Sequence, residues 1–468
     1  MMQRFKNKYR SCAHHTALMF AAAIFTAADA GAQNSEKSMN YPVRFITLDP
    51  GHFHAALIQK DMYEQVSPVV HVYAPEGAGL AAYLKLVTQY NNRPSAPTHW
   101  DEKVYSGAGY LDRMLEEKPG NVVVIAGNNR RKTEYISEAV KAGLNVLADK
   151  PMAIDARGFE LLQSAFETAR KNKVLLYDIM TERYEITNIL QRALAQDPTV
   201  FGHLEKGSVG NPAVVKESVH HFYKNVSGSP LVRPAWYYDV TQEGEGIVDV
   251  TTHLVDLVQW CCFPDVALDY RKDIRMLTAR RWPTHITLQQ FQRSTGEATF
   301  PPFLLKDIKD SILDVYANGE MNYTIQGVHA KVAVTWNYQA PEGTGDTHYS
   351  IIRGSLANLV IRQGKEQQYK PVLYVEPIVN VTSKYETALQ LATDRLQQIC
   401  PGLSLKKTTA GWQMVIPPNL GHEEHFAQVT KKFLQYLLQG NMPVWEIPNM
   451  LAKYYTTTQA IALAYKAH

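Results

Sequence analysis

Hydrophobic segments alternate between the strand and helix periods in the first part of the chain. Residues 122–126 form an unbroken apolar run, as in strands that are buried on both faces of a parallel sheet. Residues 133–142 repeat apolar positions at helical spacing and stop at Gly143. Short connections between such segments predict a doubly wound parallel sheet. The expected strands are residues 43–48, 69–73, 122–126, 145–148 and 174–177, and the expected helices are residues 53–65, 80–90, 111–117, 133–142 and 159–169.

The pattern changes after about residue 182, where strand-like segments follow one another. Turn signals such as Asn318-Gly319 separate several of them and predict an antiparallel meander. We therefore expect one domain over residues 41–182 and a second, containing both strands and helices, over residues 183–468. Expected strands of the second domain are residues 211–219, 312–317, 320–326, 330–338, 347–353, 358–362 and 372–376, and expected helices are residues 186–195, 246–260, 385–399, 425–439 and 450–467.

The N-terminus has the pattern of a bacterial secretory signal. Basic residues precede a short apolar core at residues 17–25, and small residues near position 32 offer a cleavage site. The core is shorter than the roughly 20 residues of a membrane span, and no other segment is long and apolar enough. We expect a signal peptide at residues 1–32, a polar leader at 33–40, no membrane span after cleavage and a periplasmic location.

Composition narrows the class of protein. The chain has 468 residues, of which 45% are hydrophobic and 20% charged, enough for two or three domains with large cores. A formal net charge of +3, without basic runs interleaved with aromatic residues, gives no indication of nucleic-acid binding. The cysteine spacing predicts no zinc site, and we expect no metal centre.

A charged pair follows the strand expected at residues 145–148. Asp149 and Lys150 stand at its carboxyl end, where open α/β sheets bind ligands. Pro151 keeps Lys150 out of the helical region and presents the lysine at a turn.

The turn after the first strand occupies the place of a dinucleotide fingerprint. Of the three expected glycines only Gly51 is present, followed by His52, Phe53 and His54 at the start of a helix. The histidines are interpreted as phosphate donors, as sugar ligands or as ordinary polar residues of a helix start. The acid that should end the second strand is displaced to Glu76, which either binds the adenosine ribose or is a solvated turn residue.

Three polar residues recur on one face of the helix expected at residues 246–260. Asp249, His253 and Asp256 have the spacing i, i+4, i+7. A carboxylate one turn from a histidine can orient an imidazole for proton transfer, and burial of three polar groups costs free energy unless they are paired.

These motifs together resemble the Gfo/Idh/MocA family of oxidoreductases. Asp149-Lys150-Pro151 is similar to the family's Glu-Lys-Pro, residues 249–256 to its second motif, and residues 123–129 to the segment that meets the nicotinamide. The resemblance implies a Rossmann domain followed by an α/β domain with an open, mostly antiparallel sheet, and it implies NAD or NADP with a sugar or polyol. The implied cofactor residues are Gly51, His52, Phe53, Glu76, Asn128, Asn129, Asp149 and Lys150.

The resemblance also implies roles in the reaction. Lys150 would bind the reacting hydroxyl, His253 would transfer the proton, and Asp249 would orient both substrate and histidine. His220, Trp236 and Asp256 lie where the second domain should face the substrate, although the aromatic residues are equally consistent with core packing.

Three functions follow as hypotheses. The first is an exported NAD(P)-dependent oxidoreductase acting on a carbohydrate or polyol, expected as a homo-oligomer. The second is an NAD-dependent glycosidase or keto-sugar enzyme on the same site. The third is a cofactor-free periplasmic carbohydrate-binding protein, which the two missing glycines favour and the set Lys150, Asp249 and His253 disfavours.

Overall fold

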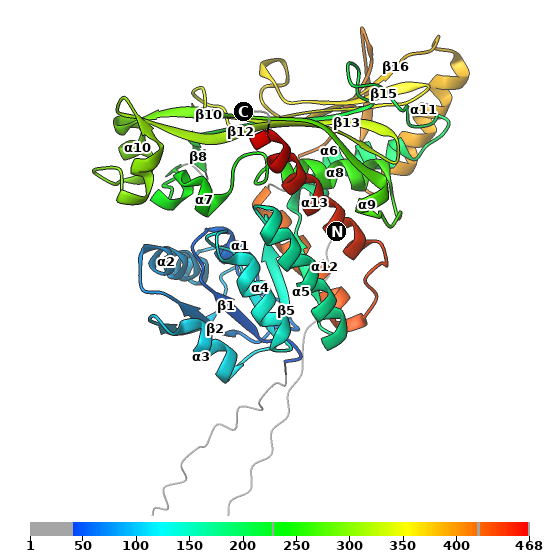
Figure 1. The fold of residues 1–468 in the computed structure, drawn as a ribbon. Coiled ribbons are helices and arrows are strands. Elements are labelled where there is room, and N and C mark those ends of the chain that lie inside the picture. The colour runs from blue at the N-terminus through cyan, green and yellow to red at the C-terminus, as the bar shows by residue number, and fades with distance from the viewer. Residues whose placement is uncertain (1–40, 227–228, 419–421, 467–468) are drawn as a thin grey trace, which may run out of the picture. The chain divides into compact units, whose positions relative to one another are not determined.

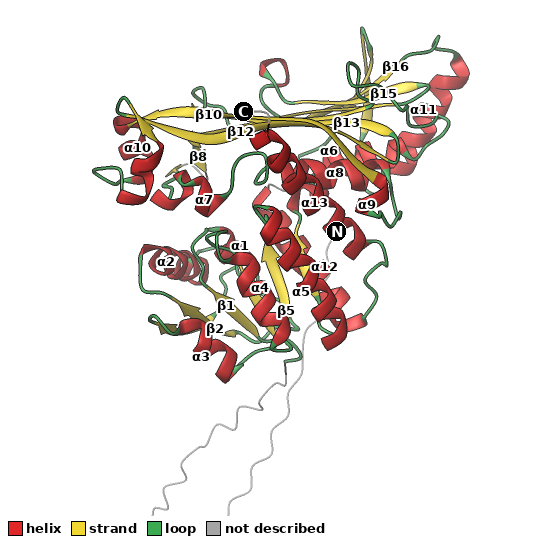
Figure 2. Ribbon diagram, in the orientation of Figure 1, coloured by secondary structure: helices red, strands yellow, loops and turns green. Residues whose placement is uncertain are grey.

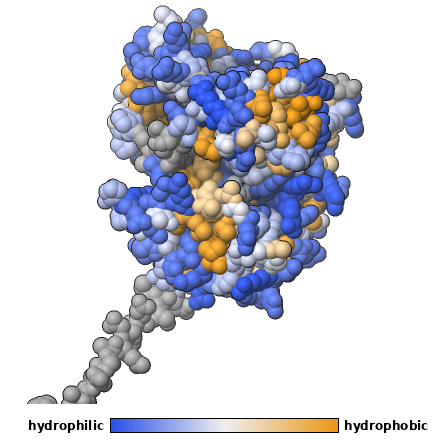
Figure 3. All heavy atoms as spheres, turned by 90° about the vertical axis from the view of Figure 1, so that its left-hand side faces the viewer, coloured by the Kyte–Doolittle hydropathy of each residue, from blue (hydrophilic) through white to orange (hydrophobic). Residues whose placement is uncertain are grey.

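The computed structural model describes residues 41–226, 229–418 and 422–466. The expected signal peptide and leader lie outside this range. In the part of the chain that is described, no helix is long and apolar enough to cross a membrane. The face shown in Figure 3 is largely hydrophilic, with hydrophobic residues gathered in limited patches.

Six parallel strands form the sheet of the first domain, in the order β3-β2-β1-β4-β5-β6 (Figures 1 and 2). Every residue of β1 and β4 is buried, as the unbroken apolar runs predict. The order reverses between β1 and β4, and this switch point is where a doubly wound sheet binds its ligand. The strands are β1 (Phe45–Leu48), β2 (Val69–Ala74), β3 (Asp101–Ser106), β4 (Val122–Ile125), β5 (Asn145–Asp149) and β6 (Leu176–Ile179).

Five helices connect these strands, and one differs clearly from its prediction. The expected helix over residues 53–65 is only α1 (His54–Ile58). The amides of Gln59 and Lys60 bond the carbonyls three residues earlier in a tighter turn, and the carbonyl of Ile58 accepts a hydrogen bond from the Tyr63 hydroxyl (2.8 Å). The others are α2 (Ala78–Asn92), α3 (Tyr110–Glu117), α4 (Lys132–Lys141) and α5 (Ala156–Asn172).

The second domain is built on a large, mostly antiparallel sheet. Its order is β10-β12-β13-β7-β14-β15-β16-β18-β17, with β11 paired to β12, and only β13 and β7 run parallel to each other. The strands are β7 (Val214–Tyr223), β10 (Ile274–Thr287), β11 (Ile308–Lys309), β12 (Ile312–Ile325), β13 (Val328–Gln339), β14 (Thr347–Arg353), β15 (Ala357–Arg362), β16 (Val372–Pro377), β17 (Ser404–Thr408) and β18 (Gly411–Val415), beside a small ribbon of β8 (Asn225–Val226) and β9 (Ser229–Pro230).

The Asn318-Gly319 turn prediction is wrong, because β12 continues through both residues. Asn318 is buried, with its Nδ2 donating to the carbonyl of Trp282 (3.0 Å) and its Oδ1 accepting from the amide of Trp336 (2.7 Å). Gly319 is required by packing, since a Cβ there would lie 2.5 Å from the Cβ of Ile247. The Asn-Gly pair therefore marks a closely packed position inside a buried strand. The pairing register with β10 also shifts at this position.

Helices pack on the large sheet, and two C-terminal helices also complete the core of the first domain. Residues 246–250 form a turn, so the expected helix at 246–260 begins only at α8. The helices are η1 (Thr181–Tyr184), α6 (Ile186–Ala195), η2 (Ala235–Tyr238), α7 (Val240–Glu243), α8 (Thr251–Cys262), α9 (Tyr270–Asp273), α10 (Leu288–Thr295), η3 (Pro302–Asp307), η4 (Lys365–Gln367), α11 (Ser383–Leu396), α12 (His422–Gln439) and α13 (Glu446–Lys466).

A buried ionic network joins the two domains and α13. Arg183 donates to both oxygens of Asp256 (2.7 and 2.8 Å) and to Glu446 (3.0 and 3.1 Å). Lys453, with a fully buried side chain, lies 2.8 Å from Asp256 and 2.7 Å from Asp178. Because each charge has a partner, the junction can exclude water without leaving an unpaired ion.

Candidate active site

Lys150 and Asp249 form an ion pair between the two domains. Lys150 directly follows β5, so the buried strand delivers it to the carboxyl edge of the first sheet. Its Nζ donates a hydrogen bond to Asp249 Oδ1, and the two side chains are 11% and 4% exposed. Burial alone would lower the pKa of Lys150, but the carboxylates of Asp249 and Asp149 outweigh burial and raise it. The site therefore holds an ammonium group beside a carboxylate.

Asp149, the last residue of β5, faces the turn that follows β1. Its Oδ2 lies 2.8 Å from His54 Nδ1 and 3.9 Å from His52 Nδ1. Burial opposes ionisation of Asp149, but His54, Lys132 and His52 outweigh it and hold the pKa of the carboxyl well below its usual range. Burial lowers the pKa of His52 well below its ordinary value, and His54 adds to this effect.

His52, His54 and Asp149 also have the composition of a metal site, which the sequence does not predict. Their possible ligand atoms all lie within 4.8 Å of one another. Two lysine amino groups lie close to this group. Lys132 is buried, its Nζ lies 3.4 Å from the carbonyl oxygen of Lys150, and its charge helps to lower the pKa of Asp149. Burial lowers the pKa of Lys132, whereas the pKa of Lys150 is raised. N–H donors beside a charged lysine oppose a metal cation and favour an anion, so we interpret this group as one that faces an anionic ligand.

Glycine residues bring the turns of the first domain together. A Cβ on Gly127 would lie 2.2 Å from the carbonyl oxygen of Asp49, and one on Gly79 would lie 3.1 Å from the Cα of Gly51. Gly51 itself has room for a Cβ, which would lie 3.7 Å from Trp236 Cζ2. Trp236, predicted as a substrate residue, thus lies over the turn predicted to bind the cofactor.

Phe53 and Glu76 border the same edge of the sheet. Phe53 precedes α1, and its ring centroid lies 4.5 Å from those of His52 and His54. Glu76 is exposed, two residues after β2. Phe53 supports the histidine pair, while the Glu76 carboxylate is open to solvent.

Asn128 and Asn129 follow β4 and contact the segment before α8. Asn128 Nδ2 donates to Gln242 Oε1 (2.7 Å), and Asn129 Nδ2 donates to the carbonyl (2.6 Å) and the carboxyl group (3.2 Å) of Glu243. Asn129 Oδ1 is buried and has no hydrogen-bond partner among the described residues.

This donor and acceptor set fits a nicotinamide dinucleotide. The orphaned Asn129 Oδ1 suits an amide N–H such as that of a carboxamide, since an unpaired buried acceptor is costly. His52, His54, Lys132 and Lys150 supply cationic or N–H donors where a fingerprint would supply backbone amides. The histidines and Asp149 lie at the ends of β1 and β5, and Asn129 follows β4, the strand between them.

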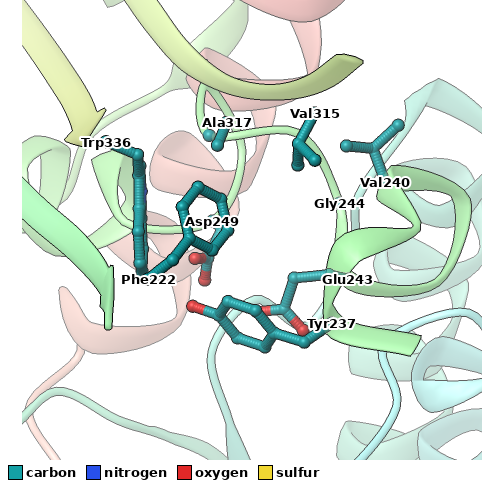
Figure 4. Close-up of a pocket in the computed structure, with 10 residues that line it drawn as sticks. Phe222, Tyr237, Val240, Glu243, Gly244, Asp249, Val315, Ala317 and Trp336 are labelled. Atoms are coloured by element: carbon teal, nitrogen blue, oxygen red, sulfur yellow. The ribbon is translucent and has the colours of Figure 1, made fainter. Parts of the chain in front are cut away.

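A small, partly open pocket lies beside Asp249 (Figure 4). Aromatic rings and small apolar side chains form most of its wall, and Glu243 and Asp249 are its two carboxyl groups. The lining residues are Phe222, Tyr237, Val240, Glu243, Gly244, Gly246, Asp249, Val315, Ala317 and Trp336. Such a wall suits the apolar face of a sugar ring, with carboxyls for its hydroxyls.

His220 lies behind this pocket on β7. Its ring stacks on Trp336 at a centroid distance of 5.1 Å. Its Nδ1 lies 2.9 Å from Asp346 Oδ2, and its Nε2 lies 2.5 Å from Ser218 Oγ. Asp346 also contacts Lys224, so the ring is fixed from two sides.

The other two residues of the predicted helical face lie in different surroundings. His253 is half-buried in the first turn of α8 and is not among the residues that line the pocket. Asp256 is 1% exposed and bound to Arg183 and Lys453, so its oxygens serve the interior network. The structure thus brings Lys150, Asp149 and Asp249 together and places Asp256 in the domain junction.

Sequence reasoning assigned no role to Glu243 and Asp346 in this region. Glu243 had one available signal, an acid directly before the Gly-x-Gly segment at residues 244–246. Asp346 carries no local signal, because its role depends on His220, 126 positions earlier in the numbering.

Comparison with known proteins defines the class of this fold and site. Residues 190–465 match the family model described as "Putative oxidoreductase C terminal domain", and residues 51–178 match "Oxidoreductase family, NAD-binding Rossmann fold". The chain belongs to the Gfo/Idh/MocA family of oxidoreductases, which confirms the resemblance seen in its motifs. No match was found among curated proteins.

Solved structures agree with this assignment. A protein from Parabacteroides merdae ATCC 43184, described as a "putative oxidoreductase", is 54% identical, with a TM-score of 0.89 over 92% of this chain and 98% of that one. A "putative myo-inositol dehydrogenase" from Sinorhizobium meliloti 1021 (14% identity, TM-score 0.53, 91% and 98% covered) and a 3-ketoreductase from Actinomadura kijaniata with NADP and TDP-benzene (15%, 0.52, 90% and 97%) share the fold.

Proposed function

We propose that this protein is an exported NAD(P)-dependent oxidoreductase that transfers a hydride between a nicotinamide cofactor and a sugar or polyol. The observation that carries the proposal is the Lys150–Asp249 ion pair, which stands at the ligand-binding edge of the first sheet and beside the aromatic pocket of the second domain. It supports an enzyme over a simple binding protein, because a buried, charged lysine can stabilise negative charge on a substrate oxygen as its proton leaves.

The cofactor would supply the hydride acceptor or donor, and this chain would handle the proton. Lys150 would hold the substrate oxygen and stabilise its negative charge as the O–H proton leaves. Asp249 would keep the ammonium group in place, and His253 would receive the proton by analogy with the family. Asn129 Oδ1 and the histidines at the first turn would hold the dinucleotide.

Release of bound small molecules tests the proposal first. The mature protein, purified from periplasm, is denatured, and the supernatant is examined by absorbance and mass spectrometry for NAD(H) and NADP(H). The protein is then supplied with each cofactor and D-glucose, methyl β-D-glucopyranoside, lactose or myo-inositol, and reduced nicotinamide is followed by absorbance. Reduction with one of these compounds supports the proposal. A protein that neither retains nor binds either cofactor is the cofactor-free carbohydrate-binding protein instead.

A second candidate is an NAD-dependent glycosidase or keto-sugar enzyme on the same site. The observation that favours it is the second carboxyl group, Glu243, in the pocket beside Asp249. Free methanol from methyl β-D-glucopyranoside without net accumulation of reduced cofactor distinguishes this outcome.

A further inference from the structure

Glu245 belongs to the turn that carries Asp249. Its carbonyl oxygen accepts hydrogen bonds from the amides of Val248 (2.9 Å) and Asp249 (3.0 Å), so a shift of Glu245 is transmitted directly to the backbone of the aspartate. The turn is packed tightly on β12, because a Cβ on Gly246 would lie 1.7 Å from the carbonyl oxygen of Ala317. The placement of Asp249 therefore depends on how Glu245 is held.

Two side chains from distant parts of the chain hold the Glu245 carboxylate. Arg281 on β10 donates to both oxygens, Nε to Oε2 and Nη2 to Oε1, at 2.7 Å each. Tyr465, in the last turn of α13, donates its hydroxyl to Oε1 at 2.6 Å. The guanidinium also lies over two aromatic rings, 3.7 Å from the centroid of Tyr316 and 4.2 Å from that of Tyr465. A bidentate pair has a fixed direction as well as strength, and we call Arg281, Glu245 and Tyr465 the brace.

The brace differs from an ion pair on the surface. The side chains of Glu245 and Arg281 are only 4% and 12% exposed, so removal of one would leave the other charge largely desolvated and unpaired. The next residue, Arg280, is 66% exposed and pairs with Glu320 at 3.1 Å, a kind of contact that contributes little. Two adjacent arginines of β10 therefore offer a shielded ion pair and a solvated one for comparison.

The helix α13 connects the brace to the domain junction. It contributes Glu446 and Lys453 to the buried ionic network of the junction, and Tyr465 to the brace. The helix packs in the cores of both domains and contacts β10 (Figure 1). One helix thus fixes the turn of Asp249 relative to the first domain, which supplies Lys150.

We propose that Arg281, Glu245 and Tyr465 are positioning residues, which hold the Asp249 carboxyl group against Lys150 from outside the pocket. None of the three is among the residues that line the pocket, although both neighbours of Glu245 in the sequence are. The brace therefore acts through Asp249 and not by touching a substrate. Its effect on turnover rests on the proposed function, whereas the contact between Asp249 and Lys150 is measured without turnover.

Trace acetylation measures this contact. The folded protein is treated with a small amount of acetic anhydride at a series of pH values, and peptide mass spectrometry gives the pH midpoint for the reaction of Lys150. If Asp249 moves away, burial dominates and lowers the pKa of Lys150. We expect the midpoint to fall by about one unit or more in Arg281→Met, because loss of a close opposite charge shifts a pKa by about 1–3 units.

Controls keep the acetylation test decisive. Arg280→Met is the matched control and should leave the midpoint of Lys150 unchanged. Equal midpoints in wild type and Arg281→Met overturn the proposal. If Arg281→Met does not fold, Tyr465→Phe decides, because it removes only one hydroxyl. Its midpoint should fall by less than that of Arg281→Met, and an unchanged midpoint in this variant then overturns the proposal.

Steady-state kinetics separate positioning from a general loss of structure. With the compound that gives the fastest cofactor reduction, we expect kcat of Arg281→Met to fall about 100-fold, as for a misplaced reacting group. Arg281→Lys keeps the charge without the bidentate geometry and should recover part of kcat. Cofactor affinity, measured by titration calorimetry, should change far less than kcat, because the predicted cofactor turns belong to the first domain.

Two results of the kinetics contradict the proposal. One is an equal loss of kcat in Arg281→Met and Arg280→Met, and the other is a loss of cofactor affinity in Arg281→Met as large as the loss of kcat. If wild-type protein reduces no cofactor with any of the compounds, the proposed function fails instead. The acetylation midpoint of Lys150 still decides whether the brace holds Asp249 in place.

Discussion

Lys150 Nζ donates its hydrogen bond to Asp249 Oδ1, joining residues that are 99 positions apart and belong to different domains. The pair depends on both domains: β5 of the first domain ends at Asp149 and positions the lysine, and the turn before α8 of the second domain positions the aspartate. A charge centre shared in this way is complete only when both domains are folded and in contact.

Replacing Lys150 by methionine should abolish most turnover without unfolding the protein. The apolar stem is retained, but the substrate oxygen loses its cationic partner and Asp249 loses its counter-ion. We expect kcat/KM to fall about 100- to 10,000-fold, measured by cofactor reduction. Lys141→Met, an exposed substitution on α4, is the control and should leave kcat/KM unchanged. Comparable turnover in the two variants would exclude a catalytic role for Lys150.

The network around Asp256 should govern acid stability. Its pKa is lowered despite burial because Arg183 and Lys453 hold the carboxylate. A folded-state pKa below the unfolded value of about 3.9 contributes stability that is complete above pH ~4–5 and is lost as pH falls further. Asp256→Asn should lower the free energy of unfolding at pH 7 by about 3 kcal/mol, because two buried cations each lose one of their two carboxylate partners.

Urea denaturation at several pH values measures this effect. The difference between wild type and Asp256→Asn should shrink between pH 5 and pH ~3, where the wild-type carboxylate begins to lose its advantage. Asp101→Asn, on the exposed edge strand β3, is the control. A difference that stays constant with pH would mean that the charge of Asp256 does not stabilise the fold.

The fold was predictable where burial is continuous along the chain. The apolar runs of β1, β4 and β5 predict strands that are buried on both faces of a parallel sheet, and the structure confirms these strands. The strand β3 was missed because its sequence, Asp-Glu-Lys-Val-Tyr-Ser, is that of a mostly exposed edge, where hydrogen bonding to β2 replaces burial.

The site was predictable only in part. Asp149 and Lys150 are visible as a charged pair after a buried strand, but nothing local shows that Lys150 meets Asp249. Glu243 and Asp346 depend on contacts that only the assembled domains create. Helical spacing predicts Asp249 and Asp256 on one face of one helix. Residues 246–250 form a turn instead, so the two side chains lie in different surroundings.

Gly127 should be needed where the turns after β1 and β4, which are predicted to bind the cofactor, approach each other. A Cβ there would lie 2.2 Å from the carbonyl oxygen of Asp49, and backbone atoms cannot move aside as a flexible side chain can. Gly127→Ala should destabilise the protein by roughly 1–3 kcal/mol and weaken NAD(P) binding, measured by thermal unfolding and by titration calorimetry. At Gly109 a Cβ has open space, and Gly109→Ala should change neither quantity comparably.

His220 should act in substrate binding more than in stability. Asp346 and Ser218 fix its ring against Trp336, which lines the pocket. Because both imidazole nitrogens are engaged by Asp346 and Ser218, His220 acts on the substrate by holding the Trp336 ring in the pocket wall. His220→Gln should raise KM by up to about tenfold, since an aromatic contact contributes about 0.5–1.5 kcal/mol, with little change in kcat. Ser218→Ala should have a smaller effect, because it leaves the Asp346 contact intact. His329→Gln, on the opposite face of β13 from Trp336, is the control. An unchanged KM with a lowered unfolding temperature would assign His220 to packing alone.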